Sequence, residues 1–276
     1  MRVELMNPTI LDTLEPYIVV SPWNRPHFDL VPFGIPIPEA NVFNPLLLRS
    51  EGFLLLLQEM DRVTFGPEGM PMPRWVFYNC SELPGGIMGF GRQSGLLSAA
   101  ERALIGVPDD YDGLVPFSMF IAIPMLPAGD WMGHNLCSLN ALLPSAGLKG
   151  LASVTKAFGL YTYRTRVLYG ATQWHSKALH IHAKFGPLDL VTAYTPAHSE
   201  PMSLTYRVEI SLNGLLNACG DPSAVIERRA PTQLLDADDV QGVRLLQDQI
   251  ERGASYQIVD RPRHEGTKTL LPIARC

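Results

Sequence analysis

The chain has 276 residues, of which 46% are hydrophobic and 18% are charged, and its formal net charge is −5. The apolar fraction suffices for a buried core, whereas the acidic balance and the lack of dense basic runs argue against nucleic-acid binding. The apolar run at 53–57 is too short to span a bilayer, and the first residues, MRVELMNPT, lack the apolar core of a secretory signal. We therefore expect a cytoplasmic globular protein with no membrane partner.

The four cysteines are widely spaced and form no CxxC pair. This spacing does not favour a zinc site or a disulfide framework. We therefore expect reduced thiols and no bound metal, in keeping with a cytoplasmic protein.

The N-terminal segment 1–43 is predicted to be an extended arm. Six prolines lie within 16–38, a density that forbids a helix and favours extended chain. A helix is predicted over 44–60, where Asn44 can cap the N-terminus and proline follows at the first helical position. A second, short helix is predicted over 98–106, ending at a glycine.

Strands are predicted through the middle of the chain, from 74 to 210. Aromatic and β-branched residues indicate a strand at 74–80, which is followed by a turn-rich segment at 82–91. A long apolar run predicts an extended segment at 114–126. Four further segments joined by short linkers have the pattern of an antiparallel meander: 157–168, 177–185, 188–196 and 202–210.

The C-terminal part is predicted to hold one helix over 236–253, with an acidic first turn and a closing glycine. A last strand is predicted at 256–260, and the tail from Arg261 is expected to be mobile. No linker is evident, so we expect a single domain over 1–276. The fold class is α+β: a curved antiparallel β-sheet or barrel with a few peripheral helices.

The densest polar cluster is GDWMGHNLCSLN at 129–140, directly after an apolar strand. Loops mounted on a rigid strand often carry binding residues, which makes Trp131, His134 and Asn135 candidates for substrate binding. The alternative is a turn whose polar groups are satisfied by local hydrogen bonds.

Lys156 lies between apolar neighbours in GLASVTKAF, a segment predicted to begin a strand. Burial disfavours the charged ammonium, lowers its pKa and makes the amine a nucleophile toward carbonyl carbon. The alternative is a lysine at a strand end that extends its ammonium to water.

Histidines offer a possible metal site. His180 and His182 are predicted to share one face of a strand, and His134 and His175 could join them. No third ligand follows at a recognisable spacing, so structural histidines are the alternative.

Two charged residues flank the predicted glycine-rich turn. Glu82 follows the predicted strand at 74–80 and could project into a pocket, and Arg92 could bind a substrate carboxylate through two hydrogen bonds. The alternative for each is a solvated surface charge.

The stretch 129–196 resembles acetoacetate decarboxylase-like proteins. GDWMGHNL resembles a polar segment of that family, and GLKGLASVTKAFGLYTY resembles its lysine segment, with Lys156 at the Schiff-base position. RVLYGATQW, KALHIHAKF and LDLVTAYTP resemble the strands that follow, which implies a cone-like barrel. The family's Pro-Lys-Lys is Thr155-Lys156-Ala157 here, so burial alone would have to lower the lysine pKa.

These observations favour a Schiff-base-forming lyase of the decarboxylase, aldolase or dehydratase type, acting on a small oxo acid through Lys156. Glu82 would shuttle protons, and no cofactor would be needed. The pocket would be lined by Arg92, Trp131, His134, Asn135, Gln173, Trp174 and His182. The alternatives are a non-catalytic small-molecule binding protein and a histidine-metal hydrolase or isomerase. We also expect a homo-oligomer in which the N-terminal arm covers a neighbouring subunit.

Overall fold

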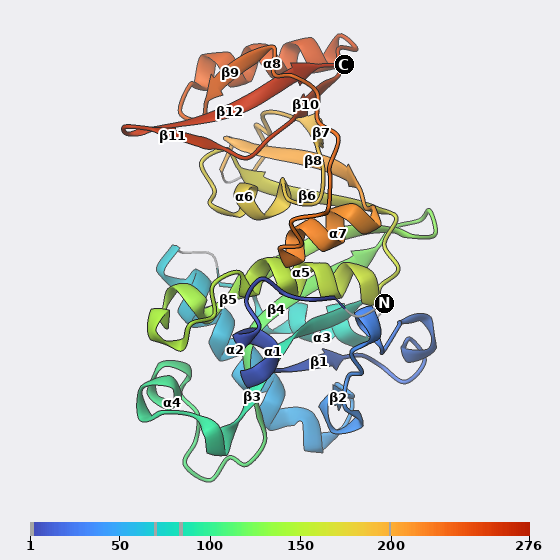
Figure 1. Ribbon diagram of the computed structural model, residues 1–276, viewed down its shortest axis with the longest axis vertical. Helices are drawn as coiled ribbons and strands as arrows, with labels where there is room; N and C mark the ends of the chain where they lie inside the picture. Colours follow the sequence, from blue (N-terminus) through green and yellow to red (C-terminus); the bar gives the residue numbers. More distant parts are fainter. Residues whose placement is uncertain (1–2, 69–70, 83–84, 199) are drawn as a thin grey trace. The chain divides into compact units, whose positions relative to one another are not determined.

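The computed structural model describes residues 3–68, 71–82, 85–198 and 200–276. The chain divides into two compact units, and each unit contains several of the strands (Figure 1). Unit 1 comprises Met1–Gly129 and Gly133–Thr165, and unit 2 comprises Asp130–Met132 and Arg166–Cys276. Helices and mostly antiparallel strands occur in both, which confirms the predicted α+β class.

The sheet of unit 1 has the strand order β2-β1-β3-β4-β5. β1 pairs with β2 in parallel, whereas β1 with β3 and β3 with β4 are antiparallel. β4 is the longest strand, and it is buried from Leu114 to Ala122 because nearly all its side chains are apolar. The strands are β1 (Glu15–Val19), β2 (Val42–Phe43), β3 (Gly86–Gln93), β4 (Leu114–Pro124) and β5 (Asp130–Ser138), of which the first three residues of β5 belong to unit 2.

Helices α2 (Glu51–Phe65), α3 (Arg74–Glu82) and α5 (Leu151–Thr162) pack on the strands of unit 1. In α2, the residues Phe53, Leu56, Leu57 and Met60 are buried, the spacing of an amphipathic helix. The helices are α1 (Thr9–Thr13), α2 (Glu51–Phe65), α3 (Arg74–Glu82), α4 (Ala99–Ile105) and α5 (Leu151–Thr162).

The sheet of unit 2 has the order β6-β8-β7-β10-β12-β11, with β9 also paired to β12. Its described pairs are antiparallel. The strands are β6 (Val167–Gln173), β7 (Leu188–Thr192), β8 (Ser203–Glu209), β9 (Gln233–Asp236), β10 (Tyr256–Ile258), β11 (Arg263–Glu265) and β12 (Lys268–Arg275). The helices are α6 (Ala178–His182), α7 (Leu212–Cys219) and α8 (Val240–Glu251).

Neither strand order returns to its first strand among the described residues, so a cone-like barrel is not confirmed, whereas a curved sheet is consistent with the pairing. The single domain over 1–276 stays a prediction. Within the described ranges, every helix is too short or too polar to cross a membrane.

Several predicted elements are confirmed. The helix predicted over 98–106 is α4, whose Ser98 forms a capping box with Glu101 and whose Gly106 takes the left-handed conformation. The strands predicted at 114–126, 188–196, 202–210 and 256–260 contain β4, β7, β8 and β10. The helix predicted over 236–253 is α8, capped by the side chain of Asp239, and the helix predicted over 44–60 begins later, at Glu51.

Three predicted strands are wrong. Segment 74–80 is in α3, where Val76, Phe77 and Cys80 are buried with helical spacing despite the aromatic content. Segment 177–185 contains α6, with Leu179, His182 and the following alanine buried. Short segments fit both periods, which is why alternation misled the prediction. The first half of 157–168 is in α5, so Lys156 lies in a helix and not in a strand.

Other predictions mistook strands for irregular chain. Segment 129–140 is largely β5 and not a loop, and Gly86–Gln93 is strand β3 in a stretch predicted as turn, of which 83 and 84 lie outside the described residues. Part of the proline-rich arm is the buried β1, and the tail predicted to be mobile forms β11 and β12. In each case, strand pairing outweighed the glycine, proline and polar content.

Candidate functional site

Helix α5 places Lys156 inside the protein. The helix follows Gly150, whose φ of 92° is the left-handed conformation that favours glycine, and ten of its twelve residues are buried. Lys156 itself is only 1% exposed. A helix that is buried on all sides has no polar face, so the helical periodicity could not be recognised in its sequence.

Helix α5 is fixed on the unit 1 sheet by polar and aromatic contacts. The hydroxyls of Thr155 and Ser118 lie 2.6 Å apart, and the Phe158 ring packs edge-on against Phe90 at 5.0 Å between centroids. At Gly159, a Cβ atom would lie 2.6 Å from the Phe120 ring, so the helix approaches β4 as closely as glycine permits. The backbone that carries the lysine is therefore held rigidly.

Burial changes the chemistry of Lys156. Desolvation lowers its pKa from 10.5 to about 7. At neutral pH, roughly half of the side chains would then hold a neutral amine, which is the form that attacks carbonyl carbon. A Schiff-base lysine without a second lysine beside it depends on this effect of burial.

A second buried ionisable group in unit 1 is Asp61 of α2, which is 1% exposed. Its carboxylate accepts hydrogen bonds from Asn135 Nδ2 at 2.9 Å and from the backbone N–H of Met72 at 2.7 Å. Burial raises the pKa of Asp61, while these two donors and the charge of His134 act in the opposite direction. In turn, desolvation lowers the pKa of His134, and the Asp61 charge partly offsets that effect. The structure thus joins Asn135 to a buried acid, and the charges of Asp61 and His134 act on each other.

Helices α2 and α5 cover opposite faces of the unit 1 sheet. The Tyr17 ring contacts Phe53 of α2 with 4.8 Å between centroids, whereas the Ser118 hydroxyl contacts α5. Tyr17 and Met119 pair with the same residue of β3, so their side chains lie on the same face of the sheet. Ser118 precedes Met119 and therefore points to the opposite face, because consecutive residues of a strand alternate between the two faces. The Asp61 carboxylate therefore lies on the face away from α5.

The same alternation separates two predicted neighbours in β5. The side chain of Asn135 points toward α2, where it binds Asp61. The preceding His134 consequently points to the other face of β5, and it is exposed. The predicted neighbours His134 and Asn135 therefore do not line one site together.

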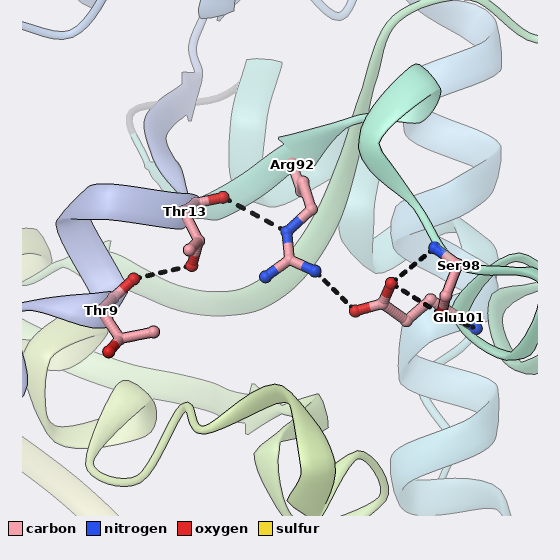
Figure 2. A network of polar contacts seen from close by, with 5 residues as sticks. All are labelled: Thr9, Thr13, Arg92, Ser98 and Glu101. Carbon is pink, nitrogen blue, oxygen red and sulfur yellow. Dashed lines mark hydrogen bonds and ion pairs between the residues drawn. The ribbon is translucent and has the colours of Figure 1, made fainter.

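Arg92 is held in an ion-pair network (Figure 2). Its Nη1 lies 2.6 Å from Glu101 Oε1, its Nε donates to the Thr13 carbonyl at 3.2 Å, and its guanidinium lies over the Phe117 ring. Glu101 also accepts from the backbone and hydroxyl of Ser98. These contacts fit a structural role, while binding of a substrate carboxylate by Arg92 stays a prediction.

Glu82 ends helix α3, and it contacts both its own helix and the N-terminal segment. Its carbonyl accepts a hydrogen bond from Trp23 Nε1 at 3.2 Å, and its carboxylate interacts with the Tyr78 hydroxyl one helical turn earlier. Its role as a proton shuttle stays a prediction.

The remaining predicted residues belong to unit 2. Trp174 is fully buried, and its Nε1 donates to the Ala193 carbonyl at 2.7 Å. The His182 ring is buried against Tyr206, with 5.1 Å between centroids. Gln173 ends β6 and is half-buried. Trp131, one of the three β5 residues in this unit, is buried as well, so the predicted residues supply aromatic surface in unit 2.

His180 and His182 do not form the predicted pair on one face of a strand. His180 lies in α6, and its Nε2 is 3.1 Å from Nε2 of His264 in β11. The parts of the chain that the structure describes hold no group of three or more His, Cys, Asp or Glu residues arranged for a metal ion.

Sequence reasoning missed Asp61. The signal was present, because Asp61 continues the buried spacing of Phe53, Leu57 and Met60 along α2, and a charged residue at such a position has to be satisfied inside the core.

No protein-family model matches the chain, and no curated protein matches it either.

Proposed function

We propose that the protein is a Schiff-base-forming lyase that acts on a small oxo acid through Lys156. The observation that carries this proposal is the burial of Lys156, which lowers its pKa to about 7 on a firmly packed helix. The amine can then attack without a second lysine beside it, and Thr155 and Ala157 flank it here.

The substrate class follows from charge. The Lys156 amine adds to the carbonyl carbon, and loss of water gives an iminium that carries one positive charge. A cation in an apolar site is costly, and a carboxylate on the same substrate offsets that cost. An oxo acid is thus favoured over an uncharged ketone or aldehyde.

The iminium then accepts an electron pair. In a decarboxylation, the bond to the carboxylate carbon breaks, carbon dioxide leaves, and the electron pair forms an enamine. Protonation at carbon and hydrolysis of the new iminium release the ketone and return the amine. Glu82 is the candidate proton carrier, with His134 as the alternative, since carboxyl and imidazole groups are common general acids and bases.

Borohydride trapping tests the proposal. The protein is incubated with acetoacetate, pyruvate and related oxo acids, reduced, and analysed by intact and peptide mass spectrometry. We expect a substrate-sized adduct on Lys156, absent in Lys156→Met and unchanged in Lys149→Met, an exposed lysine of the same unit. The trapping rate should rise through about pH 7, as the amine loses its proton.

An adduct on Lys149 instead, or an equal yield from both variants, would show ordinary surface chemistry. Ligand binding without any adduct would favour the second candidate, a non-catalytic binding protein. That candidate is supported by the buried aromatic groups Trp174 and Tyr206 in unit 2 and by the missing second lysine.

Two further statements stay predictions: a cytoplasmic location and a homo-oligomer. A monomeric mass by light scattering at micromolar concentration would contradict the second.

A further inference from the structure

Unit 2 contains a hollow of about 440 Å³, a size typical of sites for small molecules. It is formed by α7, by the chain that connects α7 to β9, and by the connection from β10 to β11. The lining residues are Asn217, Ile226, Arg228, Asp260, Arg261, Pro262 and Arg263.

Arg228 is fixed in this hollow by the backbone. Its Nη1 donates to the Val259 carbonyl at 2.7 Å and its Nη2 to the Ala183 carbonyl at 2.6 Å, and its side chain is 22% exposed. Carbonyl partners orient a guanidinium without neutralising its charge. The positive charge of Arg228 is thus held in place and stays available to an anion.

The lining charges leave a positive excess. Three arginines and one carboxylate, that of Asp260, line the hollow, so its lining residues carry a formal net charge of +2. Asp260 Oδ1 lies 3.9 Å from Nη1 of Arg228 and accepts the backbone N–H of Arg261 at 2.8 Å. Asp260 therefore stabilises the loop to which it belongs and neutralises only part of the positive charge of the hollow.

The positive field extends to a neighbouring histidine. Partial burial lowers the pKa of His180, and the charges of His264, Arg261 and Lys184 lower it further. Several basic groups from separate segments of unit 2 thus act on the same region, which an anion would stabilise.

We propose that this hollow binds the phosphate group of a small phosphomonoester. A phosphate dianion matches the net charge of +2, and guanidinium groups bind its oxygens in a bidentate manner. Ile226 and Pro262 offer apolar surface to the organic part of such a ligand. The site is built from unit 2 alone and does not depend on the chemistry of Lys156.

Calorimetry with the full chain tests the site. Inorganic phosphate and glycerol phosphate are titrated at constant ionic strength, with acetate as the carboxylate probe. We expect glycerol phosphate to bind most tightly, and each of Arg261→Ala and Arg263→Ala to weaken it by at least about tenfold. Arg228 is left intact, because its removal would also break two backbone contacts.

Arg252→Ala is the matched control, since Arg252 is an exposed arginine of unit 2 outside the lining, paired with Asp248. It should leave phosphate binding unchanged, as should Lys156→Met. Three results would overturn the proposal: no binding of either phosphate probe up to about 10 mM, equal weakening in Arg252→Ala, or tighter binding of acetate than of phosphate. Loss of Schiff-base trapping with intact phosphate binding would refute the proposed lyase and leave this site standing.

Discussion

The two units differ in how deeply their charged side chains are buried. Among the described residues, the buried aspartate, glutamate and lysine side chains, which are Asp61, Glu101 and Lys156, all belong to unit 1. In unit 2 the charged groups remain partly in water, as in the Arg207–Asp189 pair, whose side chains are 33% and 37% exposed. Unit 1 can therefore alter the reactivity of a single atom, whereas unit 2 can present a field to an anion.

Within unit 1, each buried charge is accommodated differently. Glu101 has an arginine partner, Asp61 has two hydrogen-bond donors, and burial drives Lys156 toward its neutral form. Of these three groups, only Lys156 becomes a nucleophile through its burial. Its burial should also lower the free energy of unfolding the most.

Replacing Lys156 with methionine should give the largest effect. Below pH 7 the lysine is charged in both the folded and the unfolded state, so the folded protein bears the full cost of the buried charge. Between pH 7 and 10.5 the unfolded chain binds more protons, so wild-type stability rises with pH. Lys156→Met should thus be more stable than wild type below pH 7, by on the order of 5 kcal/mol, and this gap should close as the pH approaches 10.5.

Urea denaturation at pH 6, 8 and 10 measures this gap, with Lys149→Met as the exposed control. A gap that does not change with pH would mean that the folded-state pKa of Lys156 is ordinary.

Replacing Arg92 with alanine should destabilise the protein by about 4 kcal/mol, because it leaves the buried Glu101 carboxylate without its cation and with only its Ser98 donors. The side chains of this pair are 12% and 9% exposed, so water cannot replace the lost contact. A double-mutant cycle with Glu101→Ala measures the coupling. Additive single effects would contradict the importance of the pair.

Replacing Asn135 with alanine should cost about 2 kcal/mol, since it removes a hydrogen bond to a buried carboxylate. Loss of this donor should also raise the pKa of Asp61 further, because the hydrogen bond favours the charged form. Denaturation together with NMR titration of the carboxyl group checks both effects. The control is Asn140→Ala, on the same segment, which should leave the Asp61 pKa unchanged.

Replacing Arg207 with alanine should have the smallest effect, about 0.5 kcal/mol, since water screens its ion pair with Asp189. The same denaturation assay applies. A loss as large as that of Arg92→Ala would remove the distinction between the two units.

Much of the fold could be predicted from local signals. The apolar run of β4 and the capping box of α4 are visible in the sequence, and both elements form where they were expected. Helix α5 could not be predicted, because burial on nearly all sides removes the periodicity and its aromatic residues favour a strand. Strand β5 had a usable signal, since Trp131, Asn135 and Cys137 are buried at odd-numbered positions, as alternation along a strand requires.

The candidate site was predictable in part. An isolated lysine among apolar neighbours is a sequence signal, and Lys156 is buried. The partner of Asn135 could not be predicted, because Asp61 lies 74 residues away and meets it only through the packing of α2 on the sheet. The hollow in unit 2 likewise depends on distant segments, since Arg228 is positioned by carbonyls at 183 and 259.

The close approach at Gly159 has a consequence for the evolution of this protein. The missing methyl group sets the spacing between α5 and β4, and Lys156 lies three residues away on the same helix. Any side chain at 159 would push the helix outward unless the Phe120 ring became smaller, and this would change how much water reaches the amine. The basicity of the lysine can therefore be tuned by the residues at 159 and 120 through the packing of α5, while the lysine itself is unchanged.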